Sequence, residues 1–259
     1  MKSHRKQIGR CMLPALQGGA GSLTMGRFAA MARALCFAAL AASASTNVAL
    51  AANPAETKAA LVPALQAPAH KPKRAHFEGE SASKEASYVA DWVVDSGDNR
   101  GMPFVIVDKV EAIVYVFDAS GRLSGSAPAL LGLSNGDDAV PGIGERPLSS
   151  ILPEERTTPA GRFVASLGRN MQSHEILWVD YKTAISLHPV VTGKRAEQRA
   201  ERLSSATPLD NRISYGCINV PVKFFKNVVS RAFKKTSGIV YVLPEGRPAR
   251  EIFASHDAK

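Results

Sequence analysis

The sequence FVIVDKVEAIVYVFD, at residues 104–118, gives the first indication of the fold class. Two runs of β-branched and aromatic residues, at 104–108 and 112–118, stand on either side of a short charged segment, and turn residues follow at 118–121. Short runs of this composition, bounded by turn residues, are typical of strands in a hairpin or meander. Runs of the same kind recur at 161–167, 176–181, 184–188 and 239–243. We therefore expect a mainly β domain.

Only two stretches of the chain have the features of a helix. Residues 193–203 are almost wholly polar. In 222–235 the apolar residues recur at i, i+3 and i+4, the spacing of a helix with one face in the core. The fold class that we expect is a single mainly β domain, a sandwich or barrel, with one α-helix packed after the cysteine segment. A domain of about 145 residues is large enough to bury a sizeable core.

Composition divides the chain into four parts. Residues 1–51 contain six basic and no acidic residues, and an apolar run in this part ends in Ala49-Leu50-Ala51. Residues 52–100 begin rich in Ala, Pro, Lys, Glu and Ser, which predicts a flexible tether followed by a short element at 87–98. The folded domain is expected at 101–245 and a C-terminal tail at 246–259.

The first of these parts has the pattern of a secretory signal peptide: a basic segment, a short apolar core and a small-residue cleavage site. Polar residues interrupt the apolar core, which is shorter than the roughly 20 residues of a spanning helix, so an uncleaved membrane anchor is the weaker alternative. We expect export to the periplasm, with the membrane involved only through the signal peptide.

The net charge gives no support for nucleic-acid binding. The full sequence has 32 Lys and Arg against 23 Asp and Glu, a formal net charge of +9. Six of the basic residues lie within 1–51, which leaves 26 against 23, or about +3, for the rest. No dense basic stripe interleaved with aromatic residues remains, so we expect no nucleic-acid partner.

The cysteine count leaves a single thiol in the mature chain. Cys11 and Cys36 lie in the predicted signal peptide, so the mature chain keeps only Cys217. An exported protein stabilised by disulfides carries an even set of cysteines. A single thiol in an oxidising compartment is either buried or used chemically, and the count alone does not choose between the two.

The residues around Cys217, in the sequence RISYGCINVP (212–221), favour chemistry. Gly216 lets the backbone turn tightly and brings N–H groups close to a substrate carbonyl, as an oxyanion hole requires. Asn219 and the proline after it are residues that cap and open a helix, so we expect the thiol near a helix N-terminus, where the thiolate is favoured. The alternative for Cys217 is a buried thiol that only fills the core.

A cysteine nucleophile needs a general base, and histidine is its usual partner. His70 and His76 lie in the predicted tether, His256 lies in the tail, and His174 follows a turn-like segment. His188 alone ends a strand candidate that runs toward the cysteine segment, so we select it as the base. Its alternative role is that of a hydrogen-bonded histidine at a strand end.

Together these residues resemble the catalytic domain of the L,D-transpeptidase (YkuD) family. The family pattern is a histidine, a spacer, and then Ser or Thr, His, Gly, Cys, an apolar residue and Asn or Arg. Here His188 is followed by Ser214-Tyr215-Gly216-Cys217-Ile218-Asn219. The segment TPAGRF at 158–163 is similar to a second segment of the family, and the likeness covers residues 103 to 244.

The resemblance implies a β-rich fold with a cysteine site that acts on peptidoglycan stem peptides. It implies that Cys217 attacks the peptide bond after the third residue of a stem and passes the thioester to an amine acceptor. His188 then acts as general base, oriented by the carbonyl of Pro189. The main chain of Gly216 and Cys217 supplies oxyanion donors. No cofactor is implied, and the sequence contains no pattern of metal ligands.

The chain departs from the family pattern at two places. Tyr215 stands where the family has its second histidine, and we expect it to form a wall of the cleft. The gap from His188 to Ser214 is longer than usual, and the surplus at 192–211 is either a lid over the cleft or a solvated surface helix. Ser214 is expected to orient the loop. Arg212 is a candidate for binding a stem carboxylate, with a solvated charge as its alternative.

Two other functions remain open beside the transpeptidase. One is a hydrolase on the same fold, a carboxypeptidase or amidase. The other is a catalytically weak module that binds peptidoglycan. Thiol reactivity separates the binding module from the two enzymes, and the fate of the acyl group separates the enzymes from each other. The sequence leaves the oligomeric state and the acceptor amine open.

Overall fold

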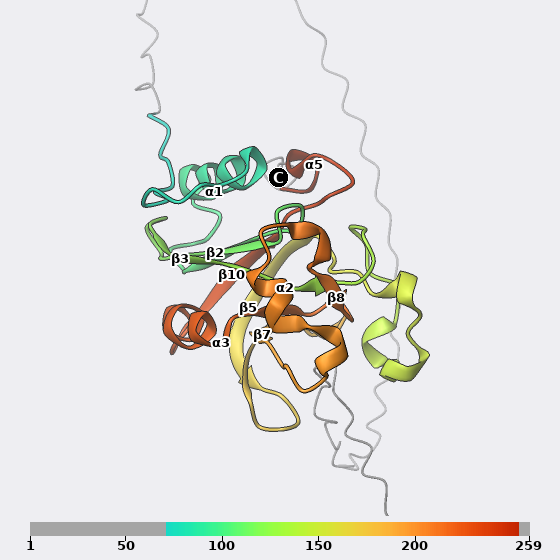
Figure 1. Ribbon diagram of the computed structural model, residues 1–259. Coiled ribbons are helices and arrows are strands. Elements are labelled where there is room, and N and C mark those ends of the chain that lie inside the picture. The colour runs from blue at the N-terminus through green and yellow to red at the C-terminus, as the bar shows by residue number, and fades with distance from the viewer. Residues whose placement is uncertain (1–70, 254–259) are drawn as a thin grey trace, which may run out of the picture. The chain divides into compact units, whose positions relative to one another are not determined.

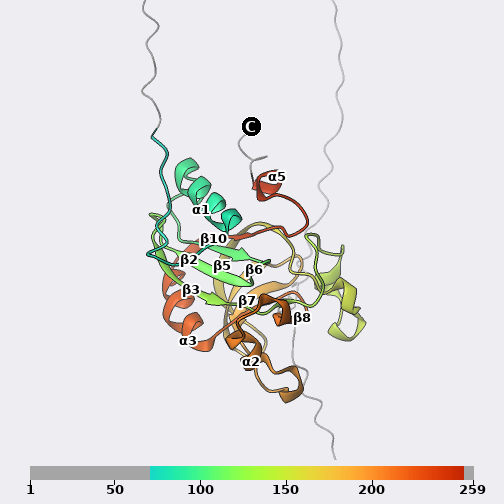
Figure 2. The same cartoon turned by 45° about the horizontal axis from the view of Figure 1, so that its top comes forward.

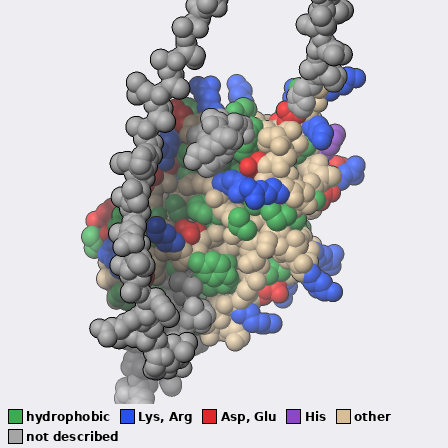
Figure 3. Space-filling view, turned by 180° about the vertical axis from the view of Figure 1, so that it is seen from behind, with side chains coloured by type: hydrophobic (Ala, Val, Ile, Leu, Met, Phe, Trp, Pro, Cys, Tyr) green, Lys and Arg blue, Asp and Glu red, His purple; other side chains and the backbone are tan. Residues whose placement is uncertain are grey.

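The computed structural model describes residues 71–253 (Figure 1). The predicted signal peptide, the first part of the predicted tether and the last six residues lie outside the described residues. Within 71–253, no helix is long and apolar enough to cross a bilayer. The face turned away from the viewer of Figure 1 carries Lys and Arg side chains dispersed among apolar and uncharged ones (Figure 3).

One eight-stranded sheet forms the body of the described region (Figures 1 and 2). Its strands, in spatial order, are β3 (Leu123–Pro128), β2 (Ile113–Phe117), β1 (Phe104–Asp108), β10 (Ser237–Val242), β5 (Gly161–Arg169), β6 (Glu175–Asp180), β7 (Ile185–Pro189) and β9 (Ile218–Val220). The pairs β1–β10 and β7–β9 are parallel and the other pairs are antiparallel. All six predicted strand runs are present.

The two ends of this sheet meet. Leu130, which follows β3, forms an antiparallel bridge with Asn219 of β9, and their backbone hydrogen bonds measure 2.8 and 2.9 Å. Beside this bridge, β4 (Leu131–Gly132) pairs in parallel with β8 (Arg212–Ser214). The sheet is therefore nearly closed into a barrel, and the expected mainly β fold class is confirmed.

The central strands are buried on both faces because each face packs against a different core. In β1, Val105 and Val107 face the first core, whereas Phe104 and Ile106 face the second. Successive side chains of a strand point to opposite sides, so a strand covered on both sides needs an apolar residue at every position. The uninterrupted FVIV run meets this requirement.

The helix expected after the cysteine fills the first core. It runs through α3 (Val222–Phe224), a π-helical turn (Phe225–Val229) and α4 (Ser230–Ala232). Phe225, Val229 and Phe233 are buried with the barrel strands. This part of the prediction is confirmed, and the helix forms one wall of the site described below.

Residues 71–100 are more ordered than the sequence suggested. Helix α1 spans Lys84–Ser96, begins at the N-cap Ser83 and ends at Gly97, whose φ of 69° is in the left-handed region. Ala86, Val89, Ala90 and Val93 are buried against the second core. These four positions follow the i, i+3, i+4, i+7 pattern, a helical signal that our prediction of a short element at 87–98 missed.

The predicted C-terminal tail also contains a packed helix. Helix α5 (Ala249–Phe253) buries Ala249 and Phe253, and the Phe253 ring stacks on Trp92 of α1 with centroids 6.1 Å apart. Figures 1 and 2 show α1 and α5 together on one side of the sheet. Both helices are therefore part of the fold because they cover its second core.

The insertion at 192–211 is folded into short turns rather than one helix. It contains 3₁₀ turns at Arg195–Glu197 and Pro208–Asp210 and helix α2 (Arg199–Ser204). Gln198, with a φ of 44°, breaks the predicted helix of 193–203. A left-handed residue cannot continue a right-handed helix, so the chain changes direction just before Arg199.

Candidate active site

The candidate residues lie where the parallel strands β7 and β9 run side by side. Leu187 pairs with Ile218, and His188 pairs with Asn219. Because alternate residues of a strand share a face, Cys217 projects to the same side as Asn219, and Ser186 to the same side as His188. The Ser186 hydroxyl donates to Cys217 Sγ at 3.8 Å. The thiol and the imidazole therefore project from the same face of the sheet, two residue pairs apart.

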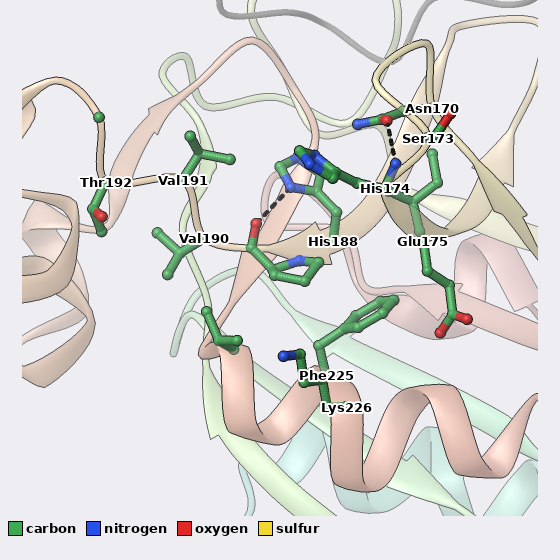
Figure 4. A pocket seen from close by; sticks show the side chains of 14 residues that line it. Asn170, Ser173, His174, Glu175, His188, Val190, Val191, Thr192, Phe225 and Lys226 are labelled. Carbon is green, nitrogen blue, oxygen red and sulfur yellow. Dashed lines mark hydrogen bonds between the residues drawn. The ribbon is translucent and has the colours of Figure 1, made fainter.

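The His188 ring is held through both of its nitrogens. Nδ1 lies 2.9 Å from the Pro189 carbonyl, the contact drawn in Figure 4. A carbonyl can only accept, so Nδ1 carries the proton and Nε2 is left with a lone pair in the neutral ring. The Asn219 amide nitrogen lies 3.4 Å from that Nε2.

Cys217 is almost covered, with 5% of its surface exposed. It packs with Ile176 and Trp178, and its thiol also lies 3.8 Å from the Ala184 carbonyl. The expected position at a helix N-terminus is wrong. Strand β9 separates the thiol from helix α3, whose N-cap is Pro221, and the four extended residues between them span about 13 Å.

Asn219 likewise does not cap the helix. It lies in β9 with 1% of its surface exposed, and its amide nitrogen donates to the Cys217 carbonyl at 3.2 Å. The short strand was missed because Cys217 and the residues after it form too brief a run to show a period of two. Asn219 therefore supports the cysteine and the imidazole instead of the helix.

The turn before Cys217 is closed by hydrogen bonds of Ser214. The Ser214 hydroxyl donates to the Cys217 carbonyl at 2.6 Å and accepts from the Gly216 N–H at 3.0 Å. The expected orienting contact of Ser214 with the loop is thus present. Because the Gly216 N–H donates to the Ser214 hydroxyl, it is not free to serve as the oxyanion donor that we expected, and that expectation is corrected.

Gly216 is required at its position by space and by conformation. Its φ is +118°, and a Cβ there would lie 2.5 Å from the Thr157 carbonyl oxygen and 2.8 Å from Ile185 Cδ1. The Thr158 hydroxyl donates to the Gly216 carbonyl at 2.9 Å. The segment at 158–163 thereby fixes the cysteine turn from a distant part of the chain.

Tyr215 is half-buried beneath a cation. The Arg156 guanidinium carbon lies 4.0 Å from the centre of the Tyr215 ring. A guanidinium over an aromatic face is attracted by the ring quadrupole. Arg156 belongs to the loop that contains the 3₁₀ turns Ile143–Glu145, Leu148–Ser150 and Pro153–Glu155, and no sequence signal linked it to Tyr215.

Arg212 is not available for a substrate carboxylate. Its guanidinium donates to Glu245 at 2.5 Å and to the Lys109 carbonyl at 2.9 Å. Glu245 also lies 3.4 Å from the Lys109 ammonium, which has no exposed side-chain surface and pairs with Asp137 at 2.9 Å. Arg212 is therefore part of a buried ionic cluster, since its charge is already balanced by Glu245.

The insertion reaches the site through Arg199, which sequence reasoning did not select. Arg199 Nη1 donates to Asn219 Oδ1 at 2.5 Å, and its Nε donates to Glu197 at 2.6 Å. Burial of the Glu197 carboxyl raises its pKa, but the hydrogen bonds and charges of Arg199 and Lys194 outweigh this effect, so the pKa is lowered. Glu197 is therefore ionised and anchors Arg199.

A cavity of about 770 Å³ opens beside His188. It is bounded by the start of β6 and the turn before it, by the chain after β7, and by the helix that follows β9. Its polar and charged side chains include Asn170, Ser173, His174, Glu175, Thr192 and Lys226. Figure 4 shows Val190 to Thr192 leading away from His188, with Phe225 and Lys226 on the helix. Within 71–253, no group of three or more His, Cys, Asp or Glu residues could hold a metal ion.

No protein-family model and no curated protein matches the chain. Among solved structures, it is similar to an L,D-transpeptidase of Enterococcus faecium, at 17% identity and a TM-score of 0.32, over 55% of this chain and 50% of that one. The helical cell-shape-determining protein Pgp2 of Campylobacter jejuni matches at 14% identity and a TM-score of 0.38, over 57% and 49%.

The catalytic domain of the E. faecium L,D-transpeptidase matches at 17% identity and a TM-score of 0.30, over 54% of this chain and 95% of the domain. The chain spans about half the length of the two longer proteins.

Proposed function

We propose that this protein is a peptidoglycan L,D-transpeptidase-like enzyme that works through a thioester on Cys217. The observation that carries the proposal is that Cys217 and His188 project from the same face of the sheet, two residue pairs apart, with His188 Nδ1 bonded to the Pro189 carbonyl. This arrangement leaves Nε2, the nitrogen that can accept a proton, on the side of the sheet from which the thiol projects.

In the proposed reaction, Nε2 of His188 takes the thiol proton and the Cys217 thiolate attacks the carbonyl carbon of the third stem residue. The tetrahedral intermediate collapses, the C–N bond breaks, and the leaving amine takes the proton from the imidazolium. A second amine then attacks the thioester, gives its proton to His188 and releases the thiolate. Atoms and charge balance, and no cofactor is required.

The turn around Cys217 is suited to the oxyanion of this reaction. The Gly216 N–H is held by Ser214, so we assign the oxyanion contact to the main-chain N–H of Cys217. Tyr215, which stands where the family has its second histidine and is fixed by Arg156, would form a wall of the cleft. A rigid wall and a preformed turn lower the reorganisation that the transition state requires.

The cavity beside His188 is the proposed site for the stem peptide. Its volume of about 770 Å³ falls in the range of pockets for small ligands. Stem peptides carry both amine and carboxylate groups, and the cavity offers Glu175 for the former and Lys226 for the latter. The reaction would take place in the periplasm, after export by the signal peptide predicted at 1–51.

The experiment that tests this function is mass spectrometry of the mature protein incubated with a disaccharide-tetrapeptide, with Cys217→Ala in parallel. Loss of the terminal D-alanine together with a cross-linked dimer, both absent in Cys217→Ala, is the expected result. Loss of D-alanine without a dimer would replace the transferase with the hydrolase. No turnover and no acyl-enzyme on folded protein would leave a peptidoglycan-binding module.

A further inference from the structure

The insertion is joined to the imidazole by an unbroken series of hydrogen bonds. The Glu197 carboxylate accepts from Arg199, Arg199 donates to Asn219 Oδ1, and the Asn219 amide nitrogen faces His188 Nε2. Arg199 is well buried, with 10% of its side chain exposed. A solvated surface helix would not hold a charged side chain in this way, so the insertion is docked on the site.

Each donor and acceptor in this series is determined by its neighbour. Arginine can only donate, so the side of Asn219 that faces Arg199 must be its oxygen. The amide nitrogen must then face the Cys217 carbonyl and His188 Nε2, which lie at 3.2 and 3.4 Å. Nδ1 of His188 is occupied by the Pro189 carbonyl, so the only lone pair of the neutral ring points toward the Asn219 amide.

That lone pair is the one the proposed reaction uses. While Asn219 donates to it, Nε2 is hindered from accepting the thiol proton, and an imidazolium would set one N–H against the N–H of Asn219. We propose that residues 194–204, named here the latch, hold the site at rest, with Arg199 as the positioning residue that locks Asn219 onto His188. This proposal rests on the roles given to Cys217 and His188 above.

When the latch leaves, Asn219 is free to turn. Its oxygen can then accept from protonated Nε2, which favours the thiolate–imidazolium pair over the neutral pair. Residues 190–193 line the cavity and lead directly into the latch, so a peptide in the cavity contacts the segment from which the latch departs. Gly193 lies at this junction. A Cβ added to Gly193 would have no neighbouring atom within 4 Å, so this point of the chain is loosely packed and has room to move.

The charged and titratable groups around His188 come from four elements. Cys217 projects from the same sheet face, His174 and Glu175 line the cavity from the start of β6 and the turn before it, and Lys226 lines it from the helix. Arg199 of the latch lies behind Asn219. Arg199 carries a positive charge, and its removal would by simple electrostatics disfavour a thiolate. The latch proposal predicts the opposite effect, namely that removal of Arg199 favours the thiolate.

The test measures the rate at which iodoacetamide alkylates Cys217 in the full mature protein at pH 7 and at pH 10. Arg199→Met removes the donor and keeps the length of the side chain. Arg195→Met is the matched control, because Arg195 is an exposed residue of the same segment. Arg199→Lys restores a donor and is the conservative rescue. The assay needs no peptidoglycan, so failure of the proposed turnover and failure of the latch are distinguishable.

At pH 7 we expect Arg199→Met to react about 2- to 10-fold faster than wild type, the effect of releasing one hydrogen bond. Arg195→Met and Arg199→Lys should remain close to the wild-type rate. At pH 10, where an ordinary thiol is ionised without help, the difference should disappear. A slower or unchanged rate at pH 7 would overturn the latch. An equal acceleration at both pH values would show mere exposure of the thiol and would overturn it as well.

Two further variants test whether Arg199 acts through Asn219. In an Asn219→Ala background, Arg199→Met should add nothing, whereas a persistent effect would contradict the proposed route. Because Asn219 is buried, Asn219→Ala can fail to fold, and Glu197→Met then serves instead. Glu197→Met keeps the Arg199 charge but removes its anchor, so it should also accelerate alkylation at pH 7; wild-type reactivity would count against the latch.

Discussion

His188 and Asn219 occupy one rung of the parallel pair β7–β9, with the Asn219 amide nitrogen 3.4 Å from His188 Nε2. Two residues earlier in each segment, Ser186 and Cys217 project from the same face, and their side chains are in contact. Strand register therefore brings together side chains that are 31 positions apart in the chain. A shift of this register by one residue would turn one strand's side chains to the opposite face and separate them.

Replacing His188 should remove the reaction with little effect on folding. We expect His188→Gln to lower kcat for D-alanine release by about 10²- to 10⁴-fold, the usual contribution of a general base. His76→Gln, at an exposed histidine outside the cavity, should leave kcat within about threefold. Steady-state assays on the two variants, with thermal unfolding as a check, decide the matter. A fully active His188→Gln would remove His188 from the mechanism.

Gly216→Ala should destabilise the protein through backbone strain and collision. The positive φ and the Thr157 oxygen 2.5 Å from the new Cβ leave the methyl group no space. We expect a loss of about 2–4 kcal/mol in the free energy of unfolding. Gly193→Ala, whose Cβ would meet nothing within 4 Å, should change it by less than about 0.5 kcal/mol. Urea unfolding of both variants gives the comparison, and equal losses would contradict the assigned strain.

The Lys109 side chain should contribute strongly to stability because it neutralises buried carboxylates. Asp137 and Glu245 lie 2.9 and 3.4 Å from its ammonium. Lys109→Met would leave those charges unbalanced, and we expect a loss of about 3–5 kcal/mol. Arg122→Met, which breaks the exposed pair with Glu78, should cost less than about 1 kcal/mol. Chemical denaturation that ranks Arg122→Met as the more damaging change would refute this account of the cluster.

The same cluster predicts how stability depends on pH. Burial raises the pKa of Asp137, but the hydrogen bond and charge of Lys109 and the N–H groups of Glu245 and Gly246 outweigh it and lower that pKa below 3.8. When a carboxyl group has a lower pKa in the folded state than in the unfolded state, its ionisation stabilises the folded state. This contribution is complete at pH values above the pKa of the unfolded state. This stabilisation is lost as the pH falls from about 4 through the folded pKa.

We therefore expect Asp137→Asn to flatten the fall in unfolding free energy between about pH 4 and pH 2.5. Asp138→Asn is the matched control, because 88% of the Asp138 side chain is exposed. Urea unfolding at a series of pH values measures both slopes. A wild-type slope in Asp137→Asn would show that other carboxyl groups carry the acid sensitivity.

Local pattern was sufficient for most of the strands and for the helix after Cys217. Each of those elements is encoded by neighbours along the chain, in runs such as FVIVD or in the i, i+3, i+4 spacing of Phe225, Val228 and Val229. Helix α1 carried an equally clear pattern in Ala86, Val89, Ala90 and Val93, but the prediction gave only a short element at 87–98 and did not assign it as a helix. Strand β9, with three residues, was too short for any period to show.

Local sequence patterns were enough to predict the mainly β class and to select His188, Cys217 and Ser214 as candidates. The fold was needed to show that Arg212 pairs with Glu245, that Asn219 faces His188, and that Arg199 reaches Asn219. Arg212 and the Lys109 carbonyl are 103 positions apart. Apolar periodicity depends on near neighbours, whereas the partner of a polar group depends on strand order and register, which no local pattern encodes.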